Sequence, residues 1–229
     1  MSMQKKDFVE IEFTGKVKGG EVFDSNIKED LKQANLDFES KPLVFCLGEG
    51  MFLKSIDDFL IGKPESPATY ELDLKPEDAF GKRVPSLVQM IPLKVFIQHK
   101  ANPVPGAMFN FDGRIGKTLT VSGGRVMVDF NSPLAGKDVH YKINLKRKVT
   151  DLKEKVKALN EFLFRKDIDF TVEGNKIILR PDKDMKRFVG LFKDKYKEML
   201  GIDTEVREDE EAAEHEKARG EAESEEKAK

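Results

Sequence analysis

Residues 43–50, Leu43-Val44-Phe45-Cys46-Leu47-Gly48-Glu49-Gly50, begin with five apolar positions in a row and then reach a glycine. A strand with one covered face alternates apolar and polar residues, so this continuous run predicts a strand covered on both faces. Cys46 lies inside the run, which predicts a buried and inert thiol rather than a nucleophile. The run therefore marks the interior of the fold.

A short helix is predicted directly after this strand. Apolar residues recur there at helical spacing, at Phe52, Ile56, Phe59 and Leu60. Gly62 and Pro64 then end the helix.

Half-buried strands are predicted on both sides of this strand–helix unit. Apolar and polar residues alternate over residues 9–13, 68–74 and 139–146. Gly19-Gly20 predicts a hairpin turn to a return strand over 21–24, and residues 27–39 resemble a polar loop with a short helical piece. One short helix on a mostly antiparallel sheet is an α+β arrangement.

Composition limits the possible classes of protein. The chain has 229 residues, a net charge of -2, 17 Phe and one Cys. The single Cys excludes an intrachain disulfide framework and a multi-Cys zinc site. No apolar run approaches the ~20 residues of a membrane span, and no apolar segment of a signal peptide follows the first residues. We therefore expect a cytoplasmic protein without a membrane contact.

Motifs for nucleotide and metal chemistry are incomplete. Gly48-Glu49-Gly50 begins a dinucleotide fingerprint, but Leu53 occupies the position of its third glycine. Gly116-Lys117-Thr118 resembles the end of a phosphate-binding loop, but Phe111 replaces the required glycine. The three His have no metal-ligand spacing. We predict no cofactor and no metal.

Three segments in order resemble the FKBP family of peptidyl-prolyl cis-trans isomerases. They are Val9-x-Ile11-x-Phe13-Thr14-Gly15 with Gly20-Glu21-Val22-Phe23-Asp24-Ser25, then Leu43-x-Phe45-x-Leu47-Gly48-Glu49-Gly50, then Pro76-Glu77-Asp78-Ala79-Phe80-Gly81. The resemblance implies a twisted antiparallel sheet around a short helix. It also implies an enzyme that rotates X-Pro bonds of unfolded or nascent chains in an apolar pocket.

The resemblance also implies which residues form that pocket. Asp24, Leu53, Ile56, Phe80 and Tyr141 would take part in catalysis, and Phe13, Phe23, Leu43 and Phe52 would line the substrate pocket. Ile56 would form the floor beneath the proline ring, the Leu53 N–H would hold a substrate carbonyl, and Asp24 could interact with the distorted amide. From periodicity alone, these apolar residues would more often be ordinary core.

This chain departs from the family pattern at three of these positions. Phe80 and Phe13 stand where Tyr is common, and Ile56 stands where small members carry Trp. A missing hydroxyl donor could cost ~1 kcal/mol of binding. The alternative function is therefore a non-catalytic holdase chaperone on an FKBP scaffold.

The resemblance divides the chain into five parts. Residues 1–82 and 134–150 would form the FKBP domain, with the last strand supplied by the second part. Residues 83–133 resemble the insert-in-flap domain of SlyD-like and long archaeal FKBPs, a small β domain that implies chaperone-like binding of clients. Most of its apolar side chains should fill its own core, and a minority should be exposed.

Residues 151–204 predict an added C-terminal α-β-β-α module. Helical spacing over 152–163, a hairpin around Glu173-Gly174-Asn175 and a second helix capped by Asp184 support it. A module of about fifty residues is small for an independent core, so a homodimer or docking on the FKBP core would supply the missing burial. Basic residues over 142–157 suggest contact with nucleic acid or the ribosome, although solvated faces explain them equally well.

Residues 205–229 carry 11 acidic and 5 basic residues. This composition predicts a charged tail, either helical or disordered, that favours solubility. Alternatively, the tail competes with acidic clients for the basic body of the protein.

Overall fold

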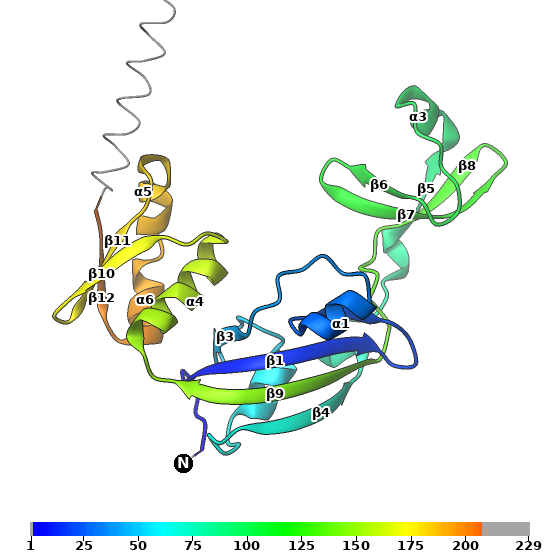
Figure 1. Ribbon diagram of the computed structural model, residues 1–229. Coiled ribbons are helices and arrows are strands. Elements are labelled where there is room, and N and C mark those ends of the chain that lie inside the picture. The colour runs from blue at the N-terminus through cyan, green and yellow to red at the C-terminus, as the bar shows by residue number, and fades with distance from the viewer. Residues whose placement is uncertain (1, 208–229) are drawn as a thin grey trace, which may run out of the picture. The chain divides into compact units, whose positions relative to one another are not determined.

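The computed structural model describes residues 2–207 and separates them into two compact units. The first unit contains residues 2–13, 39–70 and 143–207, and the second contains residues 14–38 and 71–142. Helices are combined with mainly antiparallel sheets in both (Figure 1). The predicted α+β class is therefore confirmed in its general form.

A five-stranded sheet contains β1 (Phe8–Val17), β2 (Val22–Ser25), β3 (Leu43–Cys46), β4 (Ala68–Leu74) and β9 (Val139–Val149). The order is β2-β1-β9-β4, and β3 also pairs with β1. The pairings of β1 with β2 and with β3 are antiparallel. The strands predicted from alternation and the hairpin at Gly19-Gly20 are thus confirmed.

Short helices connect these strands. They are α1 (Lys28–Gln33), α2 (Lys54–Leu60) and the 3-10 turns η1 (Pro76–Asp78) and η2 (Pro85–Leu87). Helix α2 buries Ile56 and Leu60 completely, as the helical spacing predicted. Phe45, Cys46 and Leu47 are also completely buried, so both faces of the apolar run are covered.

A second antiparallel sheet lies between η2 and β9 along the chain. It contains β5 (Val88–Pro92), β6 (Met108–Phe111), β7 (Arg114–Ser122) and β8 (Arg125–Asp129), in the order β5-β8-β7-β6. Figure 1 shows α3 (Leu93–Gln98) over one side of this sheet. The sequence analysis did not predict α3, because its six residues lie in a segment rich in Pro and Gly.

The core of this inserted sheet is aromatic. Phe96 of α3 and Val126 and Val128 of β8 are buried, and Phe109, Phe111 and Phe130 pack against them. Ring centres lie 5.3 Å apart for Phe96 and Phe109 and for Phe111 and Phe130. The insert therefore has a hydrophobic core of its own, while other apolar side chains, among them Met90, Ile97 and Met108, are exposed.

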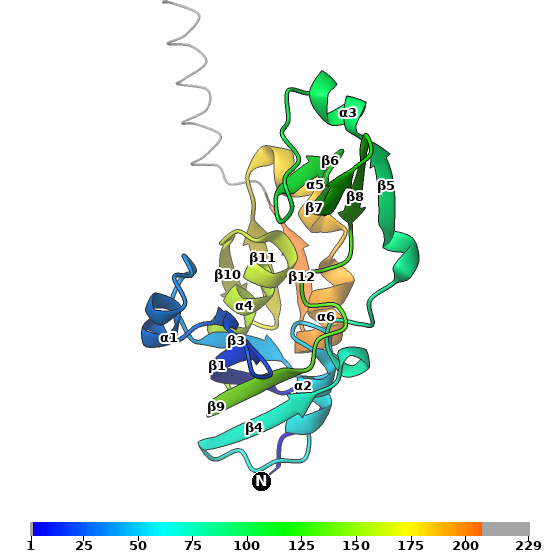
Figure 2. The same cartoon turned by 90° about the vertical axis from the view of Figure 1, so that its right-hand side faces the viewer.

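The C-terminal elements form a three-stranded sheet with helices on one face (Figures 1 and 2). In chain order they are α4 (Leu152–Phe164), β10 (Asp169–Glu173), β11 (Lys176–Arg180), α5 (Lys183–Gly190), α6 (Lys193–Leu200) and β12 (Asp203–Val206). The predicted hairpin is present, with antiparallel pairing of β10 and β11.

Three details of the C-terminal prediction were wrong. The single second helix is two helices, α5 and α6, separated by a break at Leu191 and Phe192. The residue that precedes the first of them is Asp182, and Asp184 lies in its first turn. Residues 205 and 206 belong to β12, which pairs in parallel with β11, because that pairing lets Val206 lie half-buried beside the sheet. The remaining tail residues lie outside the described part.

The C-terminal elements share one core with β1, β3 and β9. Buried side chains of Phe8, Cys46 and Val149 join Val156 and Leu159 of α4 in a single cluster. Burial raises the pKa of the Cys46 thiol to about 12, with nearby carboxylates as a smaller cause, which agrees with an inert thiol. Docking within the chain therefore supplies burial that the small module needs.

Two features are absent from residues 2–207. No helix among them is long and apolar enough to cross a membrane. No three His, Cys, Asp or Glu side chains in this part of the chain gather in a way that could hold a metal ion.

Candidate active site

The predicted pocket residues fall into two groups, one in each compact unit. The first unit holds Phe13, Leu43, Phe52, Leu53 and Ile56, and the second unit holds Phe23, Asp24, Phe80 and Tyr141.

In the first group, aromatic side chains gather beside α2. The ring of Phe13 lies 4.9 Å from that of Phe52, and the ring of Phe45 lies 5.5 Å from Phe52. Phe13 is only 5% exposed, whereas Phe52 is half-buried. Leu43 is half-buried and lies opposite Ile11 in the pairing of β3 with β1, two residues from Phe13 along β1.

The start of α2 presents a backbone donor. Leu53 is the residue before the helix, and its carbonyl accepts the N–H groups of Ile56 and Asp57 at 2.9 and 3.0 Å. Its own N–H has no hydrogen-bond partner among residues 2–207, as is typical at the beginning of a helix. This N–H is therefore available to a carbonyl from outside the chain.

In the second group, Phe23 lies between two other rings. Its ring centre is 5.4 Å from Phe80 and 5.8 Å from Tyr141, and both contacts are edge-to-face. Tyr141 is buried, and Phe23 and Phe80 are half-buried. The structure thus brings together residues from β2, from the segment after η1 and from β9, which lie far apart in the sequence.

Gly15 allows this aromatic cluster to form, although the sequence analysis did not single it out as a site residue. A Cβ at this position would lie 2.9 Å from both Phe23 Cζ and Tyr141 Cε1, which is closer than real side chains approach. Gly15 pairs with Asp24 across β1 and β2. An isolated glycine within a strand pattern is a recognisable indication of such a close approach.

Asp24 is the ionisable carboxyl of this group. Burial raises the pKa of Asp24, and a hydrogen bond from the Ser25 backbone opposes that shift. Burial also raises the pKa of the Tyr141 hydroxyl, and the negative charge of Asp24 adds to the shift. Tyr141 is therefore a neutral group, and Asp24 brings the one ionisable carboxyl of this group into a partly desolvated position.

These two groups supply apolar surface, a backbone donor and one carboxyl. Neither pairs a base with a nucleophile, so acyl or phosphoryl transfer by a covalent intermediate is not supported. Rotation about an amide bond needs no proton transfer, only an environment that favours the twisted form over the planar one.

A separate apolar surface covers the outer face of the inserted sheet. Side chains alternate across a strand, and Met127 lies between the buried Val126 and Val128. Met90 pairs with Met127, and the register through Lys117 places Met108 and Ile115 on the same face. Their exposed fractions are 55% for Met90, 61% for Met108, 54% for Ile115 and 36% for Met127. We call these four residues the outer Met face.

Comparisons with known proteins point to one family. The family model for the FKBP26 IF domain matches residues 89–134, which overlap the inserted sheet. The short-type peptidyl-prolyl cis-trans isomerase of Methanocaldococcus jannaschii is 28% identical over 147 residues, covering 63% of this chain and 92% of that protein. The three FKBP domains of wheat FKBP73 give a TM-score of 0.33 and 16% identity, over 66% of this chain and 42% of that one, and this likeness is too low to support an argument.

A bacterial relative is more similar in sequence. The protein named probable FKBP-type 16 kDa peptidyl-prolyl cis-trans isomerase from Pseudomonas fluorescens is 31% identical over 122 residues, covering 47% of this chain and 73% of that protein. The chain therefore belongs to the family of FKBP-type peptidyl-prolyl cis-trans isomerases.

Proposed function

We propose that this protein isomerises X-Pro bonds of unfolded or nascent polypeptides and holds those chains through the outer Met face of its insert. The observation that carries the catalytic part is the edge-to-face cluster of Phe23, Phe80 and Tyr141 together with the half-buried carboxyl of Asp24. The names of its relatives support the same reaction.

The chemistry follows from the barrier of the prolyl amide. Rotation costs ~18–20 kcal/mol in water because resonance gives the C–N bond partial double-bond character. An apolar environment that excludes water disfavours the charge-separated planar form, and contacts complementary to the twisted amide lower the barrier further. The reaction therefore depends on the shape of the pocket and on the exclusion of water more than on reactive side chains.

Each proposed site residue has a role in this reaction. Ile56, which is completely buried, would support the proline ring, and the Leu53 N–H would bind a carbonyl of the substrate. The apolar lining of the pocket would come from six further side chains: Phe13, Leu43, Phe52, Phe23, Phe80 and Tyr141. Asp24 would interact with the distorted amide.

Asp24→Asn tests the catalytic proposal. We expect kcat/KM on a proline peptide to fall by about tenfold, which equals ~1.4 kcal/mol of transition-state stabilisation. Asp73→Asn is the matched control, because Asp73 is an exposed carboxylate of the same unit that pairs with Lys18 and His140. Equal activity of both variants, or a wild-type rate at background, would contradict the proposal.

The client-binding proposal depends on the outer Met face. Met has a flexible and polarisable side chain that adapts to many apolar shapes, and exposed apolar patches commonly bind other proteins. We expect the triple variant Met90→Ser, Met108→Ser and Met127→Ser to lose suppression of aggregation and catalysis of proline-limited protein refolding, while turnover of a short proline peptide stays unchanged.

A matched control exists for this experiment. Leu191 is an exposed apolar side chain outside the inserted sheet, and Leu191→Ser should leave both client assays unchanged. Equal loss in the control would show that the assays report general apolar exposure, and the client-binding proposal would fail.

The alternative is a non-catalytic holdase on the same scaffold. Phe80 favours it, because its ring contacts Phe23 but has no hydroxyl to donate to a substrate. Phe80→Tyr separates the two functions: an enzyme that lacks one donor should gain a few-fold in kcat/KM, equal to ~1 kcal/mol. A holdase should show no turnover with either residue.

The remaining expectations stay predictions. They concern the cytoplasm as compartment, a homodimer and contact with nucleic acid. Several bases proposed for nucleic acid already have partners: Lys146 pairs with Glu12, Arg147 with Glu10 and Lys148 with Asp7. These ion pairs favour the simpler interpretation that the bases form a solvated face paired with carboxylates. Contact with nucleic acid would instead require RNA binding that weakens steeply with added salt.

A further inference from the structure

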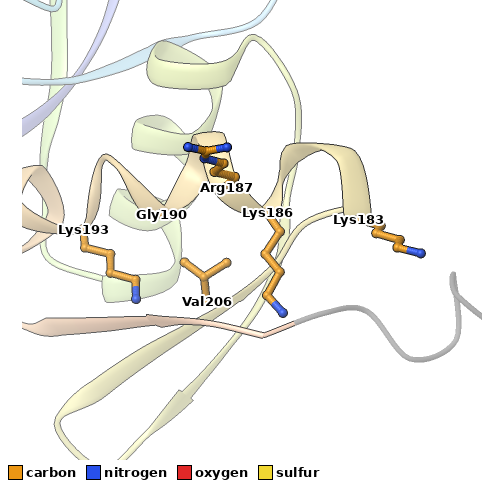
Figure 3. A pocket seen from close by; sticks show the side chains of 6 residues that line it. All are labelled: Lys183, Lys186, Arg187, Gly190, Lys193 and Val206. Atoms are coloured by element: carbon orange, nitrogen blue, oxygen red, sulfur yellow. The ribbon is translucent and has the colours of Figure 1, made fainter.

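A basic cleft lies on the C-terminal elements, and its lining includes none of the residues proposed for catalysis or client binding. It is a hollow of about 390 Å³ between α5, the start of α6 and β12. Its lining consists of Lys183, Lys186, Arg187, Gly190, Lys193 and Val206. Figure 3 shows Lys186 and Lys193 extending toward β12 on either side of Val206.

The sequence of α5 explains how this cleft forms. Lys183, Lys186, Arg187 and Gly190 are spaced by three and four residues, so they share one face of the helix. Gly190 has open space where a Cβ would stand, which keeps this face hollow. Val206 supplies the apolar part of the lining.

Three of the cations have no partner in the described part of the chain. Lys183, Arg187 and Lys193 form no hydrogen bond or ion pair with another residue between 2 and 207. Other lysines of the same elements are paired: Lys166 with Asp182, Lys195 with Glu198 and Lys197 with Asp203. Gathering unpaired like charges costs free energy, so an anionic occupant would stabilise this cleft.

The sequence of the chain itself offers an acidic segment that could be this occupant. Six carboxylates and no Lys or Arg occur in residues 208–216, and this segment begins two residues after Val206. A tethered segment has a local concentration in the millimolar range, so weak charge pairing is enough for occupancy. We propose that residues 208–216 bind in the basic cleft and shield it from other acidic polypeptides.

The surroundings of the cleft favour a short acidic peptide over a long polyanion. Residues 151–207 contain 14 basic and 12 acidic residues, so these elements as a whole carry little net positive charge. Asp182, Asp184 and Asp194 are exposed and lie next to its lysines in the sequence. A nucleic acid that ran past the cleft would meet these carboxylates.

The test uses the full chain with a neutralised tail, in which the six carboxylates are replaced by their amides. The substitutions are Glu208→Gln, Asp209→Asn, Glu210→Gln, Glu211→Gln, Glu214→Gln and Glu216→Gln. A labelled peptide with the sequence of residues 208–216 is titrated into this variant and into the unmodified chain. We expect the neutralised chain to bind it at least about tenfold more tightly, because the cleft is then open. Added salt should weaken that binding.

Two charge reversals in the neutralised chain locate the binding. Arg187→Glu with Lys193→Glu should abolish peptide binding. Lys153→Glu with Lys157→Glu, on exposed positions of α4 in the same module, should leave it within about twofold, because distant surface charges are screened. Unchanged circular dichroism establishes that both reversals fold.

Four results would overturn the proposal. They are equal peptide binding by the native and neutralised chains, no binding by either, an equal loss in the α4 control, and an RNA oligonucleotide that outcompetes the peptide for the open cleft. In the native chain, zero-length carbodiimide cross-links should join tail carboxylates to Lys183 or Lys193, and their absence would count against it as well.

Discussion

The inserted sheet and the C-terminal sheet are both small modules, and they bury their apolar side chains in different ways. The insert has a small core of its own, in which Phe96, Val126 and Val128 are the buried hydrophobic side chains and aromatic rings pack against them. The C-terminal elements instead share a large core with β1, β3 and β9 through Phe8, Cys46 and Val149.

This difference bears on the proposal that the insert binds clients. A module with a small core of its own opens at lower free energy than one that shares the main core. The insert also leaves its outer Met face uncovered, whereas the C-terminal sheet is covered by helices on one face. Easier local opening and exposed Met side chains would allow the insert to adapt to different clients. The core that the C-terminal elements share with the FKBP sheet instead suits a stabilising role.

The largest expected effect comes from Leu159→Ala in the shared core. It should lower the free energy of unfolding by about 4 kcal/mol, because it opens a cavity in a completely buried cluster. Chemical denaturation should show the loss in the transition of the FKBP sheet as well, since Phe8 and Cys46 belong to the same cluster. Lys157→Ala, exposed on the same helix, is the control. If the C-terminal elements unfolded separately at a lower denaturant concentration, they would not share a cooperative core with the FKBP sheet.

Phe96→Ala tests the independence of the insert. It should destabilise the inserted sheet by about 3 kcal/mol, because the ring contacts Phe109 and Phe111. Hydrogen exchange should then quicken in β5 to β8 while exchange in β10 to β12 and turnover of a short peptide stay unchanged. The neighbouring Ile97→Ala, at an exposed position, should change neither. Faster exchange in β10 to β12 would show that the two regions unfold together.

Acid should affect the two regions in opposite directions. In the unit of the shared core, burial raises the pKa of Asp57 to about 6, although the amides of Gly48 and Gly50 oppose the shift. The folded pKa is above the unfolded one, so protonation stabilises the fold, and this stability is lost as pH rises from about 4 through about 6. Asp57→Asn should therefore gain stability relative to wild type by on the order of 1–3 kcal/mol more at pH 7.5 than at pH 4.

Asp129 of the insert provides the contrast. Burial by itself would raise the pKa of Asp129, but hydrogen bonds from Asn131 and the charge of Arg83 outweigh it and lower the pKa. Its stabilising effect is therefore present at neutral pH and lost as pH falls below about 4. Exposed Asp58→Asn is the control for Asp57, and an equal change at both pH values would contradict the assignment to burial.

The smallest expected effect concerns the rim of the insert core. The guanidinium of Arg114 lies 4.6 Å from the centre of the Phe130 ring. Arg114→Ala should destabilise the insert by about 0.5–1 kcal/mol, measured by hydrogen exchange in β6 to β8. Lys117→Ala on the outer face of β7 should have no such effect. If Lys117→Ala lowered the stability of the insert more than Arg114→Ala, the outer face would stabilise the insert and would not serve only as a binding surface.

Local patterns in the sequence determined much of this protein. Some elements depend only on residues that are neighbours in the sequence, and each of these predicted elements is present. They are the strands predicted from alternation over 9–13 and 139–146, the apolar strand at 43–47 and the hairpin at Glu173-Gly174-Asn175. Motifs from Val9 to Gly81 also indicated the family, because those residue types occur together at that spacing.

Only the tertiary structure decided the elements that depend on distant partners. Strand β12 exists because its residues pair with β11, and Val206 alone gave no apolar pattern. Helix α3 is held by Phe109 and Phe111, about a dozen residues away, rather than by its own six-residue propensity. Gly15 is required because rings from β2 and β9 approach it, and the sequence shows neither ring as its neighbour. Burial against residues far along the chain is a property of packing, and it fixes which side chains become core, site or surface.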